Sequence, residues 1–288
     1  MAIQTAQLFV NGIAVGSIIA LGSVGLTLTY GILRLSNFAH GDFLTLGAYL
    51  TLLANSAGVN IWLSMIVGAI GVVLAMLLSE KILWTRMRKI RATSTTLIII
   101  SIGLALFLRN GIILIWGGSN QNYKLPVTPA LDIGGLKIPQ NQIIVLALAI
   151  VAIAVLHYLL QNTKIGKAMR AVADDIDLAR VSGIDVDKVV LWTWVITGTV
   201  TALGGGMYGL ITAVRPNMGW FLILPLFASV ILGGIGNPYG AIAAAFIIGI
   251  AQEVSTPLLG SQYKQGVALF IMILVLLVRP KGLFKGTI

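Results

Sequence analysis

Nine apolar runs separated by shorter polar segments set the pattern of this chain. They cover residues 8–33, 43–54, 61–84, 96–116, 143–160, 189–214, 221–235, 241–254 and 266–278. Most are long enough to cross about 30 Å of hydrocarbon as a helix, whereas 43–54, 221–235 and 241–254 are short. Short, glycine-punctuated runs are typical of broken or re-entrant helices that line a cavity. The pattern predicts an all-α polytopic membrane protein with about eight or nine transmembrane helices.

The longest polar interruption, residues 163–188, holds ten charged side chains, yet it also has a helical pattern. Apolar residues recur in it at steps of three and four, as on one face of a helix: Ile165, Ala168, Met169, Val172 and Ile176. We expect two short helices outside the membrane, with a break near residues 173–174. The segment is either a solvated connection between two spans or a docking helix for another protein.

The second of these short helices carries its own end signals. Asp174 is the expected N-cap, and Asp177 lies three residues on, close to a capping box. Arg180 falls in the last turn, where a cation complements the helix dipole. Gly183 falls just past the end, where a left-handed backbone conformation favours glycine.

Composition and charge agree with a membrane location. Hydrophobic residues make up 58% of the 288 residues and charged residues only 10%, whereas about a quarter of a soluble domain is charged. The formal net charge of +10 is better explained by basic cytoplasmic loops than by nucleic-acid binding. The chain has no cysteine, which excludes disulfides and thiolate metal sites. The first run lacks a basic segment before it, so we expect a span rather than a signal peptide.

Loop charges predict the orientation of the chain. Residues 80–91 and the tail, 279–285, are basic and should be cytoplasmic, whereas 55–60 and 117–142 carry few charges and should be outside. Alternation then places 163–188 and the C-terminus in the cytoplasm, and nine spans place the N-terminus outside. We expect one transmembrane permease domain, 1–288, with 163–188 as a loop within it.

Enzyme signatures are missing from the sequence. A phosphate-binding G-x-x-x-x-G-K-[ST] loop does not occur, because Gly166 and Lys167 are followed by Ala168. His40 and His157 are the only histidines, too few for a histidine-rich metal site. We therefore assign no catalytic, metal or cofactor residues and expect any ATPase activity to reside in other subunits.

Polar residues at membrane depth are the candidate pathway or gating groups, because burying them there is costly. Asn37, His40 and Asp42 form one cluster, either a turn at the pathway or a loop with Asn37 as an N-cap and Arg34 near Asp42. Arg109 and Glu253 have similar inferred depth and opposite charge. They either pair, directly or through a partner permease, or snorkel separately to the interface.

Two glycine-rich segments have structural interpretations. The triple glycine 204–206 favours close helix packing. Residues 236–238, Gly-Asn-Pro, indicate a tight turn between two short helices.

Four motifs in order carry a resemblance to a known family. They are LSNFAHG at 35–41, GKAMRA at 166–171 followed by the acidic helix to Gly183 and Ile184, GGIGNPYG at 233–240, and RPKGLF at 279–284. The chain resembles, nearly end to end, the permease subunits of branched-chain amino acid ABC importers of bacterial plasma (inner) membranes. The resemblance implies a second homologous permease, two ATP-binding subunits and an extracytoplasmic solute-binding protein, besides contact with membrane lipid.

The resemblance also implies a role for residues 174–183 as the coupling helix that docks on the ATPase. Its ATPase-coupling residues would be Asp174, Asp175, Asp177, Ala179, Arg180 and Gly183. The implied cargo is a neutral, mainly branched-chain aliphatic amino acid. A urea or short-amide importer of the same build is the first alternative. An ion-coupled secondary carrier is a second, with Asp42 and Glu253 as its candidate carboxylates, and a membrane scaffold a third.

Overall fold

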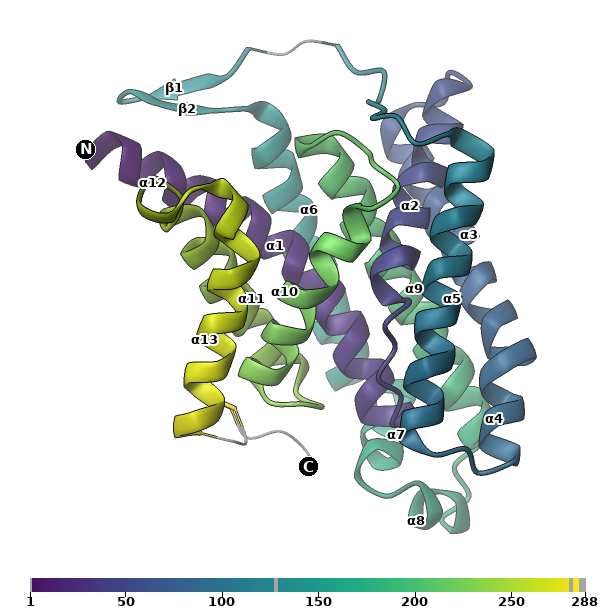
Figure 1. The fold of residues 1–288 in the computed structure, drawn as a ribbon. Coiled ribbons are helices and arrows are strands. Elements are labelled where there is room, and N and C mark those ends of the chain that lie inside the picture. The colour runs from purple at the N-terminus through teal and green to yellow at the C-terminus, as the bar shows by residue number, and fades with distance from the viewer. Residues whose placement is uncertain (1, 127–128, 280–281, 285–288) are drawn as a thin grey trace.

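The computed structural model describes residues 2–126, 129–279 and 282–284, and helices dominate this part of the chain (Figure 1). Each of the nine predicted apolar runs coincides with a helix. These are α1 (Ala2–Leu33), α2 (His40–Ser56), α3 (Ile61–Ser79), α5 (Ser94–Trp116), α6 (Gln140–Asn162), α9 (Val186–Ile211), α10 (Met218–Gly233), α11 (Pro238–Val254) and α13 (Lys264–Val278).

Six helical segments in the described ranges are long and apolar enough to cross a membrane, and α10 and α11 are shorter apolar helices. With α2, a 17-residue helix, the structure has nine candidate spans, so the prediction of a polytopic all-α membrane protein is confirmed. Helix α1 has 32 residues, hence about 48 Å at 1.5 Å per residue, which exceeds the hydrocarbon thickness. It runs obliquely across the molecule, the expected response of a long apolar helix (Figure 1).

The core lies where α1, α2, α9, α10 and α11 pack together. Helix α1 packs most extensively against α11, and α9 contacts α1, α2 and α3. By contrast, only 6% of the apolar segment of α13 and 17% of that of α5 is buried. An exposed apolar helix surface of this kind suits lipid or a partner helix.

Small residues permit the closest helix approaches in the core. Gly41 in the first turn of α2 lies against Gly219 in the first turn of α10, and a Cβ on either would clash with the backbone of the other. Within the predicted triple glycine, Gly205 lies equally close to the backbone of Leu44. The close packing predicted for the triple glycine is therefore confirmed at Gly205.

Short elements complete the fold. A π-helical segment, η1 (Glu80–Trp84), leads from α3 into α4 (Thr85–Lys89). Helices α7 (Lys164–Asp174) and α8 (Ile176–Val181) connect α6 to α9. α12 (Thr256–Leu259) and the 3-10 turn η2 (Ser261–Tyr263) precede α13.

The segment between α5 and α6 contains an antiparallel hairpin, β1 (Leu131–Ile133) and β2 (Leu136–Ile138), that the sequence pattern did not predict. Gly134 and Gly135 both have positive φ, which is typical of a tight hairpin turn. The hairpin lies at the end of the bundle opposite α4, α7 and α8 (Figure 1). The basic segment 80–91 and the 163–188 segment thus share one end, as loop charge predicted.

The predicted turn at 236–238 is also confirmed. Asn237 is the N-cap of α11, and its Oδ1 accepts from the backbone N–H groups of Tyr239 and Gly240 at 3.1 and 3.0 Å. Pro238 occupies the first turn of that helix, where its missing N–H is tolerated.

Candidate functional site

Helices α7 and α8 form a capped helical pair at one end of the molecule. Thr163 caps α7, its Oγ1 accepting from Gly166 N–H at 3.0 Å. The break falls one residue later than the sequence predicted. Asp174 is the last residue of α7, and Asp175 caps α8 by accepting from the N–H groups of Asp177 and Leu178, both at 2.9 Å. The prediction of Asp174 as N-cap was wrong because α7 extends one residue further.

The C-terminal end of α8 agrees with the sequence prediction. Gly183 has φ of +85°. Its N–H donates to Arg180 O at 3.1 Å, and Ile184 N–H donates to Ala179 O at 3.0 Å, the two hydrogen bonds of a Schellman cap. Arg180 lies in the last turn of α8. The six-residue helix is therefore fixed at both ends by its own sequence.

The two helices present different surfaces. In α7, Met169 and Val172 are buried against the bundle, as the periodicity predicted. In α8, Ala179 faces inward at 4% exposure, whereas Leu178 and Val181 are 63% and 81% exposed. The predicted apolar face therefore ends with α7, since Ile176 is also exposed. Short α8 leaves apolar side chains in solvent, an arrangement that suits contact with another protein.

A second feature is the extended segment between α1 and α2, which interrupts the helical path. Asn37 and His40 are fully buried there. Asn37 Oδ1 accepts from Ala39 N–H at 3.1 Å, and His40 Nε2 lies 2.9 Å from Gly22 O and 3.2 Å from Thr201 Oγ1. Ala39 precedes the first helical residue of α2, so Asn37 is not the helix N-cap of the structural alternative.

Two polar atoms of this segment have no hydrogen-bond partner within the described ranges: Asn37 Nδ2 and His40 Nδ1. Unpaired buried polar atoms are uncommon in native structures and each needs an explanation. Together with the interrupted helix, they mark residues 34–42 as a strained, polar point inside an apolar bundle.

Asp42 and Arg109 form a buried ion pair in the first turn of α2. Arg109 Nε and Nη2 lie 3.0 Å from Asp42 Oδ1 and Oδ2, a two-point contact across 67 residues of sequence. The guanidinium carbon also stands 4.9 Å from the ring centroid of Trp220 on α10. The cluster therefore joins α2, α5 and α10 near the point where α2 and α10 begin.

The prediction that Arg109 pairs directly with Glu253 was wrong. Glu253, near the end of α11, accepts from Lys264 Nζ at 2.5 Å instead. The alternative pairing of Arg34 with Asp42 is also wrong, because Arg34 donates to Ala173 O at 3.5 Å. Loop proximity in sequence suggested that pair, but the extended segment separates the two side chains.

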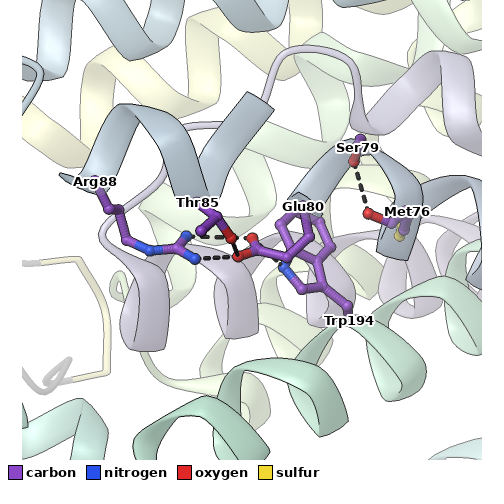
Figure 2. Close-up of polar contacts among 6 residues, drawn as sticks. All are labelled: Met76, Ser79, Glu80, Thr85, Arg88 and Trp194. Carbon is purple, nitrogen blue, oxygen red and sulfur yellow. Dashed lines mark hydrogen bonds and ion pairs between the residues drawn. The ribbon is translucent and has the colours of Figure 1, made fainter. Parts of the chain in front are cut away.

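A third polar cluster, around Glu80, escaped the sequence analysis. Glu80 begins the π-helical segment, and it accepts from Thr85 Oγ1 at 2.7 Å, Trp194 Nε1 at 2.8 Å and the guanidinium of Arg88 (Figure 2). Ser79 Oγ bonds back to Met76 O at 2.7 Å, immediately before the segment. π-Helical bulges occur often at functional sites.

The Glu80 cluster ties the end of α3 to α9. Glu80 is 9% exposed, and Trp194 is fully buried. The segment 80–91 has five cations beside Glu80, so the sequence alone indicates that Glu80 belongs to a solvated basic loop. The π-helical winding turns the Glu80 side chain inward. The only sequence signal for its contacts is that Thr85 and Arg88 lie five and eight residues after Glu80.

Two side chains outside the spans have shifted pKa values. The hydrogen bond and charge of Lys188 lower the pKa of Asp185, which caps α9 by accepting from Lys188 N–H. Burial raises the pKa of Tyr123, whose hydroxyl donates to Ala48 O at 3.2 Å. The first contact caps the start of α9, and the second holds the segment between α5 and α6 to the middle of α2.

The described residues contain no group of three or more His, Cys, Asp or Glu that could hold a metal ion. The three clusters are instead ion pairs and caps that join helices. Such an arrangement positions helices relative to one another.

A family model and several known relatives match nearly the whole chain. The family described as "Branched-chain amino acid transport system / permease component" matches residues 8–276. The chain is 32% identical to the high-affinity branched-chain amino acid transport system permease protein LivH of Escherichia coli, over 96% of this chain and 94% of that protein. It is 30% identical, at the same coverage, to the corresponding permease protein BraD of Pseudomonas aeruginosa.

A solved structure shares the fold. PsaBC from Streptococcus pneumoniae, in complex with Fab, matches with a TM-score of 0.54 over 96% of this chain and 92% of that chain. The sequence identity is 13%, so this likeness concerns the fold alone.

Proposed function

Since the chain belongs to the family of branched-chain amino acid transport permeases, we propose how it works: with a second homologous permease it forms the pathway of an ATP-driven importer. It is a permease subunit of a branched-chain amino acid transport system. The cargo that this family membership favours is a neutral, mainly branched-chain aliphatic amino acid. Two ATP-binding subunits and an extracytoplasmic solute-binding protein complete the proposed importer.

The observation that carries the ATP-driven mechanism is α8. It is a six-residue helix, too short to be stable alone, yet Asp175 and Gly183 cap it at both ends. It exposes Leu178 and Val181 at the end of the bundle that also carries the basic 80–91 segment. A capped helix that exposes apolar side chains at the basic end fits docking in a groove of an ATP-binding subunit.

Movement of α8 has a direct path into the bundle. Helix α7 precedes α8 with only Asp175 between them, and it packs against α6, α9 and α1. Arg34, just after α1, donates to Ala173 O of α7, and α1 leads into the interrupted segment before α2. A push on α8 therefore reaches the 34–42 segment and the Asp42–Arg109 pair through packed helices. ATP binding reorients the pathway only if its two states differ in affinity for the docked subunits.

The proposed orientation follows the loop charges. We place α4, α7, α8 and the C-terminus on the cytoplasmic side of the bacterial plasma (inner) membrane, and the β1–β2 hairpin outside. Residues 280–281 and 285–288, which belong to the C-terminal tail, lie outside the described residues.

The other candidate functions have less support. An ion-coupled carrier needs a carboxylate free to exchange its proton or cation, but Asp42 and Glu253 are held by Arg109 and Lys264. A urea or short-amide importer would have the same architecture. Only the transported molecule distinguishes it from the proposed amino acid importer.

The test is uptake by the reconstituted importer. The chain, its second permease, the ATP-binding subunits and the binding protein are placed in liposomes, and ATP-dependent uptake of labelled leucine is measured. Valine and isoleucine should compete, and urea and formamide should not. A Val181→Asp variant should lose uptake and ATPase association, whereas Leu114→Asn, on the exposed face of α5, serves as a control for surface substitution. Leucine uptake without ATP, or competition by urea alone, contradicts the proposal.

A further inference from the structure

A cavity of about 900 Å³ lies at the end of the bundle that carries α4, α7 and α8, and the Glu80 cluster forms part of its wall. It opens between the end of α1, the η1–α4 segment, α7–α8 and the start of α9. One part of its wall is apolar: Ile32, Leu33, Leu77, Val172, Ile176, Val186, Val190 and Leu191.

The remaining wall is mainly basic. It includes five cations, Arg34, Lys81, Arg88, Lys89 and Arg180, against two carboxylates, Glu80 and Asp187. Both oxygens of Glu80 already accept from Arg88, Thr85 and Trp194 (Figure 2). Glu80 therefore neutralises Arg88, and the other four cations of the cavity wall share one carboxylate, that of Asp187.

The side chains of Lys81, Lys89 and Arg180 have no ion pair or hydrogen bond to any residue in the described ranges. They come from three separate elements, η1, α4 and α8, and converge on one cavity. Cations on separate elements repel one another across a shared space, so their convergence is unfavourable unless an anion lies between them.

The backbone of Arg34, which lines the cavity, has an unusual conformation. Its φ is +52°, in the left-handed region that glycine normally occupies at a helix end. A long cationic side chain is kept at this strained position, where it lines the cavity and reaches Ala173 O. Strain of this kind at a helix end is a sign of function when the side chain points into a site.

We propose that this cavity binds a phosphate-bearing anion. Guanidinium and ammonium groups from several directions match the oxygens of a phosphate. The apolar wall beside the basic wall fits the glycerol and first acyl carbons of an anionic phospholipid. The exposed apolar side chains Leu74, Leu78 and Ile82, on α3 and η1, could contact the rest of the acyl chains. The site goes beyond the transport role and does not depend on it. A soluble phosphate ester offers the same head chemistry without the tail.

The test uses the purified full chain in nanodiscs made of phosphatidylcholine with a minor fraction of phosphatidylglycerol. Native mass spectrometry measures which lipid stays bound after release from the disc. The variant is Lys81→Gln/Lys89→Gln, which removes two cavity cations. The matched control is Arg86→Gln/Lys164→Gln, which removes two exposed cations that do not line the cavity.

We expect the wild type to retain phosphatidylglycerol in preference to phosphatidylcholine. Retention should fall about fivefold for each cavity lysine removed, from the attraction of one cation to an anionic headgroup. The control should retain wild-type binding, and high salt should weaken binding in every case. Equal losses in the two double variants, or no preference in the wild type, overturn the proposal.

A competition arm separates the two sources of the anion. If millimolar glycerol 3-phosphate leaves phosphatidylglycerol bound, the site takes a lipid headgroup. If glycerol 3-phosphate displaces phosphatidylglycerol from the wild type and not from the cavity variant, the cavity binds phosphate and its ligand is a soluble ester. Co-purification of each variant with the ATP-binding subunits is measured separately. A cavity variant that keeps its lipid but no longer co-purifies with those subunits shows that the cations serve a protein contact, and the proposal is then wrong.

Discussion

Arg109 on α5 holds Asp42 on α2 through two N–O contacts of 3.0 Å, with the Asp42 side chain 2% exposed and that of Arg109 15% exposed. Removing one member leaves the other charge buried without its partner, which costs about 3–5 kcal/mol. We expect Asp42→Asn and Arg109→Gln each to lower the melting temperature of the detergent-purified chain strongly.

The double variant provides the control for this pair. Because Asn and Gln together leave no buried charge, Asp42→Asn/Arg109→Gln should be less destabilised than the sum of the single variants. Thermal unfolding followed by size-exclusion chromatography measures all three. Strictly additive losses would show that the ion pair is not an energetic unit.

The Glu80 cluster gives a second prediction. Glu80→Leu should destabilise the chain by about 1–3 kcal/mol because Trp194 Nε1 would remain buried without an acceptor. Glu80→Gln keeps an acceptor oxygen for Trp194 and should cost less. Hydrogen exchange of the peptide spanning 80–89 is the local measurement, and it should speed up far more in Glu80→Leu. Identical exchange in the two variants contradicts this account.

Gly183 gives a third prediction. A Cβ at this position meets no atom within 4 Å, so the only penalty of a side chain is the backbone conformation at φ +85°. Gly183→Val should cost about 1–3 kcal/mol of local strain and fray α8. The variant should insert at near-normal levels, lose uptake and co-purify poorly with the ATP-binding subunits.

Gly183→Asn is the matched control, because asparagine adopts the left-handed conformation more readily than valine does. It should retain much of the uptake. Full uptake by Gly183→Val, with the ATP-binding subunits still bound, would reduce residues 163–188 to a simple connection between spans.

The contact between Gly41 and Gly219 gives a fourth prediction. Gly41→Ala or Gly219→Ala should destabilise the chain by about 1–3 kcal/mol, since the added methyl forces two backbones apart. Gly103→Ala, on α5, is the control, because a Cβ there meets nothing within 4 Å. Melting temperatures of the three purified variants test the difference, and equal values would argue against a tight approach of α2 to α10.

The fifth prediction concerns nucleotide hydrolysis. The purified chain alone should hydrolyse ATP no faster than buffer, because its sequence has no phosphate-binding loop. Phosphate release from chain freed of other subunits is the measurement. Activity that persists through further purification, at constant ratio to the chain, contradicts the assignment of ATP hydrolysis to other subunits.

Local features of the sequence determined much of this protein. Apolar runs fixed the nine helices, because backbone groups in lipid must bond within their own helix. Helix ends were also local: Gly183 and Asn237 act through backbone angles and hydrogen bonds to near neighbours. The N-cap of α8 was misplaced by one residue, because Asp174 and Asp175 are equally suited to it and only the actual length of α7 decides between them.

Partners distant in sequence were decided by the tertiary structure alone. Arg109 has Asp42 rather than Glu253 as its partner, because the break after α1 sets the first turn of α2 beside α5. Glu80 is buried because the π-helical segment turns it toward Trp194, 114 residues away. The charge pattern of the sequence gives the sign of each charged side chain and its approximate depth in the membrane. Which distant residue it pairs with depends on how the helices cross. That crossing is set by the packing of side chains over the whole bundle.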